Sequence, residues 1–511
     1  IEMVVLADEK PKFPHEIYYV DPHPKAKFNV LKNGFRYILM PNFNQNGKIF
    51  ISLLVNAGAI HEIEGQQGVA HFVEHMAFNG TKNHPSESLS KFLSNMGMSL
   101  DEDANAKTGL YHTEYLLSLQ TSDSLNEGLS ILSDFAMNIT FDKTEIEKEK
   151  GVVLSEKRYR NSLFDSVSNR QNQFVLPNIS FAQNAVIGSE SAIQGITQEA
   201  CLDYYKNNYR PKNMVLIVVG DFNIKNCEKA ILEKFEGCTD KSNRVSLPSQ
   251  IEVKHEGTKV NYVYEAGLPI VNIKIGTAQK IAPPGKSFFE NSKIELAELA
   301  AEYIMQKRLV GNVLQKDCPL NSFYFKNENF GEQFNVTSIE ANCEADKWEA
   351  ALNLLSCELN KAIRFGFLDS EVESFKDWYR NKLKTDLDEK GSLQNNELMS
   401  QILNSLKENK PFADNKQSYK LSKVLLECLS KDAVHNEFKK YWVCDHRLID
   451  NCGNVLIKEP NVEIKKVYES AIIVKDEEVK KESSFKFPYD IKPKEPWSIS
   501  KSQDISDHFF S

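Results

Sequence analysis

The sequence predicts an α+β fold built from two related domains, and three observations support this class. The 511 residues exceed what one hydrophobic core usually organises, so two or more domains are expected. Strand-like and helix-like patterns are mixed along the chain, which is typical of sheets packed with helices. The succession of strands and then helices in the first half is echoed in the second half.

The first half opens with a predicted β-hairpin. Residues 28–39 contain two apolar-rich runs around Asn33-Gly34, the dipeptide that most strongly favours a tight turn between antiparallel strands. A further strand is predicted at 48–55, and three glycines then precede a predicted helix at 69–78. The other elements expected in this half are helices at 87–96 (capped by Ser86), 122–138, 143–160 and 198–207 (capped by Thr197), and strands at 111–119 and 214–220.

The second half begins after a predicted linker. Residues 236–250 are rich in glycine, serine, asparagine and proline, a composition that indicates a domain boundary. Beyond it we expect strands at 260–264 and 271–276, helices at 289–309 and 346–364, and a helix opened by a capping box of Ser370 and Glu373. From residue 474 onward, lysine, glutamate and proline dominate, which predicts a tail or a connector.

Composition excludes several classes of function. The net charge of -9 argues against broad nucleic-acid binding, which normally needs a basic face. The longest apolar runs are far shorter than the roughly 20 residues of a membrane-spanning helix, so a soluble mature chain is expected. The nine cysteines form no Cys-x-x-Cys pair, which argues against a disulfide framework and a cysteine zinc knuckle. The apolar run at residues 4–7 is a weak sign of a cleaved export signal.

The motif His-Phe-Val-Glu-His at residues 71–75 carries the predicted chemistry. On a helix it places His71 and His75 one turn apart on the same face, where both imidazoles can reach one tetrahedral ion. Glu74 lies next to His75 and projects near the same face of the helix, where its carboxylate can take a proton from metal-bound water. The order of these residues is inverted relative to the commoner zinc-protease helix. The motif therefore predicts a Zn²⁺ site with Glu74 as the general base.

A catalytic zinc ion needs a third protein ligand, and the helix predicted at 143–160 offers candidates. Glu149 and Glu156 lie two turns apart on one face of this helix, whereas Glu145 and Glu147 point elsewhere or lie nearer its end. We expect Glu156 to be the third ligand and Glu149 to hydrogen-bond a ligand from behind.

Two simpler interpretations of these residues are chance and a closed structural zinc site. With 11 histidines in the chain, a random match to the motif is uncommon. A structural site would need two further ligands nearby and would leave Glu74 without a role. A solvated charged helix would suit Glu145 and Glu147 better than Glu149 and Glu156.

The motif resembles a known family. Residues 71–82, preceded by Gly58 and Gly68, resemble the pitrilysin or insulinase family of zinc metallopeptidases, which includes mitochondrial processing peptidase. Three further segments are similar to parts of that family: its active-site strand (Asn105-Ala106, His112-Thr113 and Tyr115), its third-ligand helix (151–156) and its closing strand (211–220). The sequence of residues 76–82 resembles that of bacterial envelope members of the family, whose full chains contain two such halves.

This resemblance implies an architecture and a way of binding substrate. Residues 25–240 would form the catalytic zinc-binding domain and residues 250–470 a second, related domain without a zinc site. An N-terminal extension (1–24) would precede them, and a tail or connector (471–511) would follow. Together the two domains would form one half of a clamshell chamber. A peptide would add as a strand to a sheet edge, for which Asn105, Ala106 and Lys107 are the candidates.

The predicted function is that of a zinc-dependent metalloendopeptidase that cleaves unfolded or small polypeptides. The alternatives are a non-catalytic peptide-binding or scaffold subunit of the same family, and a metal hydrolase that acts on a small substrate. The expected partners are a peptide substrate and a second clamshell half, supplied by a homodimer, a heterodimer or a missing C-terminal half. The resemblance implies the bacterial periplasm or cell envelope, with the cytoplasm as the alternative.

Overall fold

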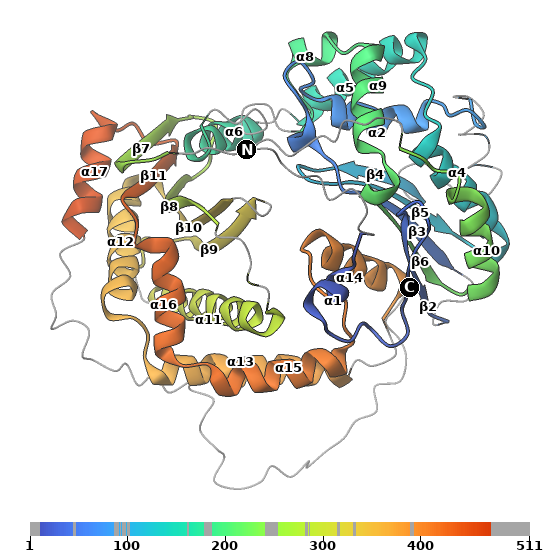
Figure 1. Ribbon diagram of the computed structural model, residues 1–511. Coiled ribbons are helices and arrows are strands. Elements are labelled where there is room, and N and C mark those ends of the chain that lie inside the picture. Colours follow the sequence, from blue (N-terminus) through green and yellow to red (C-terminus); the bar gives the residue numbers. More distant parts are fainter. Residues whose placement is uncertain are drawn as a thin grey trace, which may run out of the picture.

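The computed structural model describes most of the chain, and its elements are drawn in Figure 1. The described residues are 11–43, 48–85, 91, 94, 99, 103–160, 163–177, 186–240, 254–281, 285, 287–313, 317–330, 334–388 and 393–471. Most of the helix predicted at 87–96, most of the predicted linker and the tail beyond residue 471 lie outside them. In the described part, no helix is both long enough and apolar enough to cross a lipid bilayer.

Two mixed, mostly antiparallel sheets organise the chain. The first has the order β1-β2-β6-β3-β5-β4 and the second the order β7-β11-β8-β10-β9. The strands of the first sheet are β1 (Lys27–Val30), β2 (Arg36–Pro41), β3 (Ile49–Val55), β4 (Ala104–Thr108), β5 (Thr113–Leu119) and β6 (Met214–Gly220). Those of the second are β7 (Gly257–Tyr264), β8 (Val271–Lys280), β9 (Ser322–Phe330), β10 (Phe334–Cys343) and β11 (His446–Gly453).

The two sheets share one topology, which confirms that the halves are related. Strands β2-β6-β3-β5-β4 and β7-β11-β8-β10-β9 occupy equivalent places in the chain. In each series the first pair is parallel and the other three pairs are antiparallel. Helix α2 (Val69–Phe78) follows β3, and α11 (Phe288–Val313) follows β8 at the corresponding position. Of these two helices, α2 contains histidine and α11 does not, so α11 has no counterpart of the His71–His75 motif.

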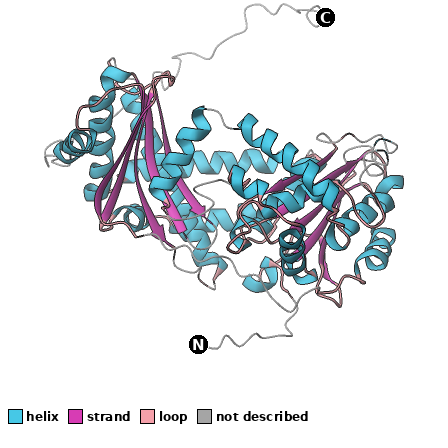
Figure 2. Cartoon of the chain, turned by 90° about the horizontal axis from the view of Figure 1, so that it is seen from above, coloured by secondary structure: helices cyan, strands magenta, loops and turns pink. Residues whose placement is uncertain are grey.

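Helices cover the sheets on both faces (Figures 1 and 2). Helix α14 (Asn395–Lys407) of the second half lies by the first sheet, and helix α6 (Leu163–Val175) of the first half lies by the second sheet (Figure 1). On one face of the first sheet, α4 (Leu125–Met137) and α10 (Ile224–Phe235) enclose the largest apolar core. On the opposite face lies α14 from the second half, which buries Met399 and Ile402 against Ile217. In return, α6 of the first half packs on the second sheet. This exchange ties the two halves together through apolar contacts.

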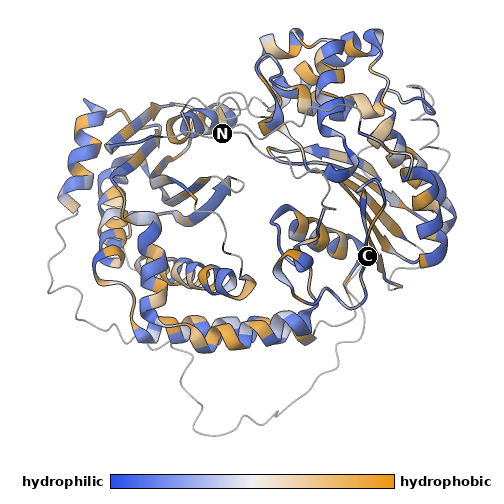
Figure 3. Ribbon diagram, viewed as in Figure 1, coloured by the Kyte–Doolittle hydropathy of each residue, from blue (hydrophilic) through white to orange (hydrophobic). Residues whose placement is uncertain are grey.

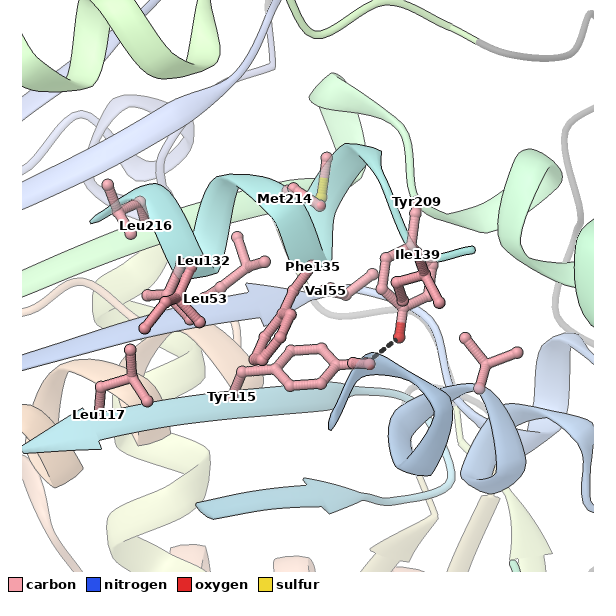
Figure 4. Close-up of a cluster of buried hydrophobic side chains, with 14 of the residues drawn as sticks. Leu53, Val55, Tyr115, Leu117, Leu132, Phe135, Ile139, Tyr209, Met214 and Leu216 are labelled. Atoms are coloured by element: carbon pink, nitrogen blue, oxygen red, sulfur yellow. Dashed lines mark hydrogen bonds between the residues drawn. The ribbon is translucent and has the colours of Figure 1, made fainter. Parts of the chain in front are cut away.

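Figure 4 shows part of the core of the first half. Apolar side chains from β3, β5, β6 and α4 surround Tyr115, whose hydroxyl lies 2.7 Å from the hydroxyl of Tyr209. This bond satisfies two polar atoms that would otherwise be costly to bury. Figure 3 shows the pattern behind this packing: the strands of the first sheet are largely hydrophobic, whereas the helices carry hydrophobic and hydrophilic residues side by side.

The remaining helices complete both halves. In the first half they are α1 (Pro14–Tyr18), α5 (Lys143–Arg160), α8 (Glu190–Gln194) and α9 (Gln198–Asn208), with 3₁₀ turns at Ala59–His61, Ser122–Ser124 and Pro211–Asn213. In the second half they are α12 (Trp348–Phe365), α13 (Asp369–Asp388), α15 (Asn415–Cys428), α16 (Lys431–Trp442) and α17 (Pro460–Ala471), with a 3₁₀ turn at Ala345–Lys347.

Of two predicted helix caps, the structure confirms one and contradicts the other. The hydroxyl of Thr197 accepts a hydrogen bond from the backbone of Ala200, as predicted for the cap of α9. The capping box of Ser370 and Glu373 is wrong, because α13 already begins at Asp369. Glu371 accepts the hydrogen bond from the Leu368 backbone at 2.8 Å. Arg308 binds the same carboxylate through two nitrogens, and this bidentate pair fixes the helix start two residues before the position that a Ser370 cap would give.

The turn between β4 and β5 gives the fold a predicted pH dependence. Burial, together with the charge of Lys407 and the nearby His61, lowers the pKa of His112 from 6.5 to about 4. The unfolded chain therefore binds a proton at His112 before the folded chain does. The contribution of His112 to stability is present above pH 6.5 and is lost as the pH falls toward 4.

We expect the free energy of unfolding to fall by up to about 3 kcal/mol over this window because of His112 alone. Urea unfolding at pH 7 and at pH 4.5 measures the loss. The variant His112→Gln should show a smaller loss than the wild-type chain. Equal losses in both proteins would contradict the assignment to His112.

Candidate metal and active site

The metal-site helix α2 begins at a glycine that is conformationally required. Gly68 has φ 86°, and a Cβ added there would lie 2.7 Å from the carbonyl oxygen of Ile187. Since glycine has no side chain to cap the helix, the Glu62 carboxylate does so, accepting hydrogen bonds from the backbone of Gly68 (3.1 Å) and Ala70 (2.9 Å). Burial raises the pKa of Glu62 to about 8, and the two backbone bonds oppose this rise. A half-buried carboxylate therefore orients the first turn of the helix.

Helix α2 is buried between the sheet core and α5. Phe72, Val73 and Met76 point into the core of the first half, which fixes the rotation of the helix about its axis. The histidines consequently share the other side, with ring centroids 4.5 Å apart. His71 is only 6% exposed, so its imidazole cannot simply point into solvent.

Helix α5 brings Glu156 to the two histidines. Its Oε2 atom lies 3.7 Å from Nε2 of His71 and 3.2 Å from Nε2 of His75. Candidate ligand atoms of all three residues lie within 4.8 Å of one another, the one such cluster of three or more in the described part of the chain. The predicted trio therefore converges, although its members come from two helices far apart in sequence.

The supporting carboxylate predicted at Glu149 lies behind His75. Its Oε1 is 2.7 Å from Nδ1 of His75, and its Oε2 accepts a 2.6 Å hydrogen bond from the Asn79 side chain. The bond at Nδ1 leaves Nε2 of His75 to face Glu156. Burial alone would lower the pKa of His75, but the hydrogen bonds to Glu149 and Glu156 raise it to about 9. This position thus favours positive charge.

Glu74 lies beside the cluster without joining it. It is 7% exposed, and its Oε2 accepts a 2.5 Å hydrogen bond from the hydroxyl of Thr108. Burial raises the pKa of Glu74, while the Thr108 bond and the charge of His75 oppose this rise. A carboxylate whose pKa is raised toward neutrality can both accept and return a proton.

The strand that holds Thr108 is an edge of the first sheet. Among the described residues, β4 pairs with β5 as its one neighbouring strand, and it lies next to α2 in Figure 1. Asn105, Ala106 and Lys107 all belong to this strand, in agreement with an edge position. Their proposed contact with substrate stays a prediction.

The donor set fits a zinc ion. Two ligands of a tetrahedral zinc ion with bonds of about 2.0–2.2 Å stand roughly 3.3–3.6 Å apart. The 3.2 Å and 3.7 Å separations between Glu156 and the histidines are close to this range. Two imidazoles and one carboxylate, with Glu149 behind them, also match the ligand chemistry of catalytic zinc sites.

Sequence reasoning missed three residues that build this site. Glu62 caps the helix, Asn79 anchors Glu149, and Thr108 anchors Glu74. Asn79 lies one helical turn after His75, so its spacing was a usable signal. Glu62 and Thr108 lie outside α2 and reach it from neighbouring segments. Their contacts could be found only from the three-dimensional structure.

Comparisons with known proteins bear on the family and the fold of the chain. Residues 37–174 match the family model described as "Insulinase (Peptidase family M16)", and residues 195–377 match the one described as "Peptidase M16 inactive domain". The chain is 26% identical over 423 residues to "Probable zinc protease PqqL" of Escherichia coli, covering 80% of this chain and 44% of that protein. It is also 26% identical over 275 residues to "Cytochrome b-c1 complex subunit 1, mitochondrial" of Bos taurus, covering 54% of this chain and 55% of that protein.

Solved structures show the same fold. The first half of the periplasmic protease PqqL from Escherichia coli superposes with a TM-score of 0.80 at 22% identity, covering 89% of this chain and 98% of that one. In the structure of the complete protease, the matching part superposes with a TM-score of 0.79 at 22% identity and covers 95% of this chain and 53% of that one. The chain thus spans about half the length of the complete PqqL protease.

Proposed function

Because the chain belongs to the insulinase family of peptidases, family M16, we propose that it is a zinc-dependent endopeptidase acting on unfolded or small polypeptides. The observation that carries this proposal is the convergence of His71, His75 and Glu156 beside the buried carboxylate of Glu74. A scaffold has no need of such an arrangement, since buried acids and paired histidines cost stability unless they bind something.

In this proposal His71, His75 and Glu156 hold the zinc ion. When bound, zinc supplies Lewis-acid chemistry, which activates water and polarises a carbonyl. Glu74 accepts the proton of the attacking water and delivers it to the nitrogen of the departing amine. Thr108 holds one oxygen of Glu74 and so keeps its carboxylate in one orientation. Glu149 and Asn79 keep the His75 ring turned toward Glu156.

The substrate in this proposal binds as an extra strand along β4. As far as the described residues go, no strand pairs with the outer edge of β4, which leaves backbone groups there for another strand. An extended peptide can form main-chain hydrogen bonds there with little regard to its sequence. This mode suits polypeptides that are unfolded or small, because a folded domain rarely presents a free strand.

A second half is also part of the proposal. The fold corresponds to the first half of a protease about twice as long. We propose that a second clamshell half closes over β4, supplied by another chain or by a longer form of this one. The PqqL protease of Escherichia coli is periplasmic, and we propose the bacterial periplasm or cell envelope for this chain as well. We likewise propose the domain limits 25–240 and 250–470.

A second candidate function is that of a non-catalytic subunit. The bovine relative is named as a subunit of the cytochrome b-c1 complex and not as a protease, so the family fold also serves other roles. A scaffold subunit would show no dependence of peptide binding or cleavage on zinc.

Metal removal tests the proposal. We expect the chain to bind one zinc ion, to cleave an unstructured fluorogenic peptide, and to lose that cleavage on chelation and regain it with added zinc. Zinc should also raise the melting temperature, because a ligand present at 100 times its Kd stabilises the fold by about 2.7 kcal/mol. His71→Ala should abolish both effects. Cleavage that survives chelation, or a chain that binds no zinc, would contradict the proposal.

A further inference from the structure

The two faces of strand β4 differ in chemistry. Ala104, Ala106 and Thr108 share a face with Tyr115 and Leu117, their partners on β5 in the core beneath α2. Asn105 and Lys107 share the other face with their partners Leu116 and Glu114. That second face is the one covered by α14, since Leu116 packs against the cluster that α14 completes.

Lys107 is the cation on this second face that has no acid to neutralise it within the described chain. Its cross-strand partner is Glu114, the residue expected to pair with it. The Glu114 carboxylate instead binds Lys407 of α14, with 2.6 Å between Nζ and Oε2. Lys107 is exposed, and it forms no ion pair with any residue that the structure describes. Among the described residues, Lys107 therefore adds a positive charge to this edge that no carboxylate pairs with.

The position of Lys107 is close to the proposed chemistry. The next residue, Thr108, donates its hydroxyl hydrogen bond to Glu74. A strand added to β4 would place one of its side chains beside Lys107, because directly opposed residues stand about 5 Å apart on the same face of a sheet. That side chain would belong to a residue next to, or one removed from, the bond that Glu74 serves.

We infer that Lys107 is a specificity-determining residue that favours an acidic side chain at the paired position of the bound peptide. The inference rests on the proposed function and adds a substrate class to it: extended peptides with aspartate or glutamate near the cleaved bond. Main-chain pairing would supply the bulk of the affinity, and Lys107 would set the register and the preference.

The expected effect is modest and specific to position. Opposite charges across a strand pair contribute up to about 1 kcal/mol, or roughly fivefold in affinity, and like charges cost a similar amount. Because Lys107 is exposed, the preference should fade at high ionic strength. It should therefore be measured at low salt and again at about 0.5 M salt.

The test is a charge swap measured by binding. The full chain carrying Glu74→Gln is loaded with zinc and titrated with labelled peptides of about 12 residues. All residues of each peptide are uncharged except one glutamate, or one lysine, whose position differs from peptide to peptide. We expect one register in which glutamate tightens binding about threefold and lysine weakens it about threefold. The added substitution Lys107→Glu should reverse this order. The matched control Lys229→Glu changes the net charge equally on the exposed surface of α10 and should leave the order unchanged.

The outcomes separate the two levels of the proposal. The inference is overturned if peptide binding does not depend on the charge of the varied residue, or if Lys107→Glu does not reverse the preference. Either result leaves the peptidase proposal in place. A reversal of equal size in Lys229→Glu also overturns it, since the effect would then be one of net charge. If no peptide binds to this variant and the wild-type chain cleaves none, the proposed function and the inference fall together.

Discussion

Glu74→Gln is expected to lower kcat for peptide cleavage by about 10²- to 10⁴-fold while leaving zinc binding intact. The substitution keeps the shape of a side chain that is 7% exposed, and its amide oxygen can still accept the hydrogen bond from Thr108. The amide cannot take a proton from water, so the loss should fall on kcat and not on KM. Glu74 has no part in the ligand cluster, so zinc content measured by mass spectrometry should stay at one ion per chain.

A matched control separates this effect from the general effect of losing a carboxylate. Glu147 lies on α5 and pairs with Lys150, and its side chain is 70% exposed. Glu147→Gln should keep full activity and full zinc content. Unchanged cleavage by Glu74→Gln would refute the role given to Glu74, whereas loss of zinc from this variant would mean that Glu74 is itself a ligand.

The sequence predicted the two helices of the candidate site because their local signals agree with tertiary packing. The motif helix spans Val69–Phe78 and the ligand helix Lys143–Arg160, both with the predicted limits. In α2 the apolar stripe that predicts a helix is the same stripe that the sheet buries, so local and global preferences coincide. The start of α13 was mispredicted because Arg308, distant in sequence, selects Glu371 in place of the local capping box.

The candidate site was predictable only in part. The spacing of His71 and His75 is a property of one helix, and the pairing of Glu149 with Glu156 is a property of another. That Glu156 faces Nε2 of both histidines, whereas Glu149 contacts Nδ1 of His75, depends on how α2 and α5 cross, which no local pattern encodes. The exchange of α6 and α14 between the halves was likewise beyond local reasoning, because it depends on apolar faces that meet only after both sheets have formed.

Glu156→Ala is expected to weaken zinc binding more than any other single substitution on α5. In the proposed site the side chain provides one of three ligand atoms, its Oε2 lying 3.2 Å from Nε2 of His75, and alanine offers nothing in its place. Loss of a carboxylate that only supports a ligand typically costs about 10- to 100-fold in metal affinity, so loss of the ligand itself should cost more than about 100-fold. Competition with a chelator of known affinity at fixed pH measures the difference, and circular dichroism checks that α5 still forms.

Three positions on α5 make this prediction a ranked series. Glu149→Ala should cost about 10- to 100-fold, because His75 keeps Nε2 but loses the partner that orients its ring. Glu147→Ala should leave zinc affinity unchanged, since this exposed side chain pairs only with Lys150 among the described residues. A larger loss from Glu149→Ala than from Glu156→Ala would exchange the roles of the two carboxylates. The ranking therefore tests how the two helices cross, which is the physical basis of the whole site.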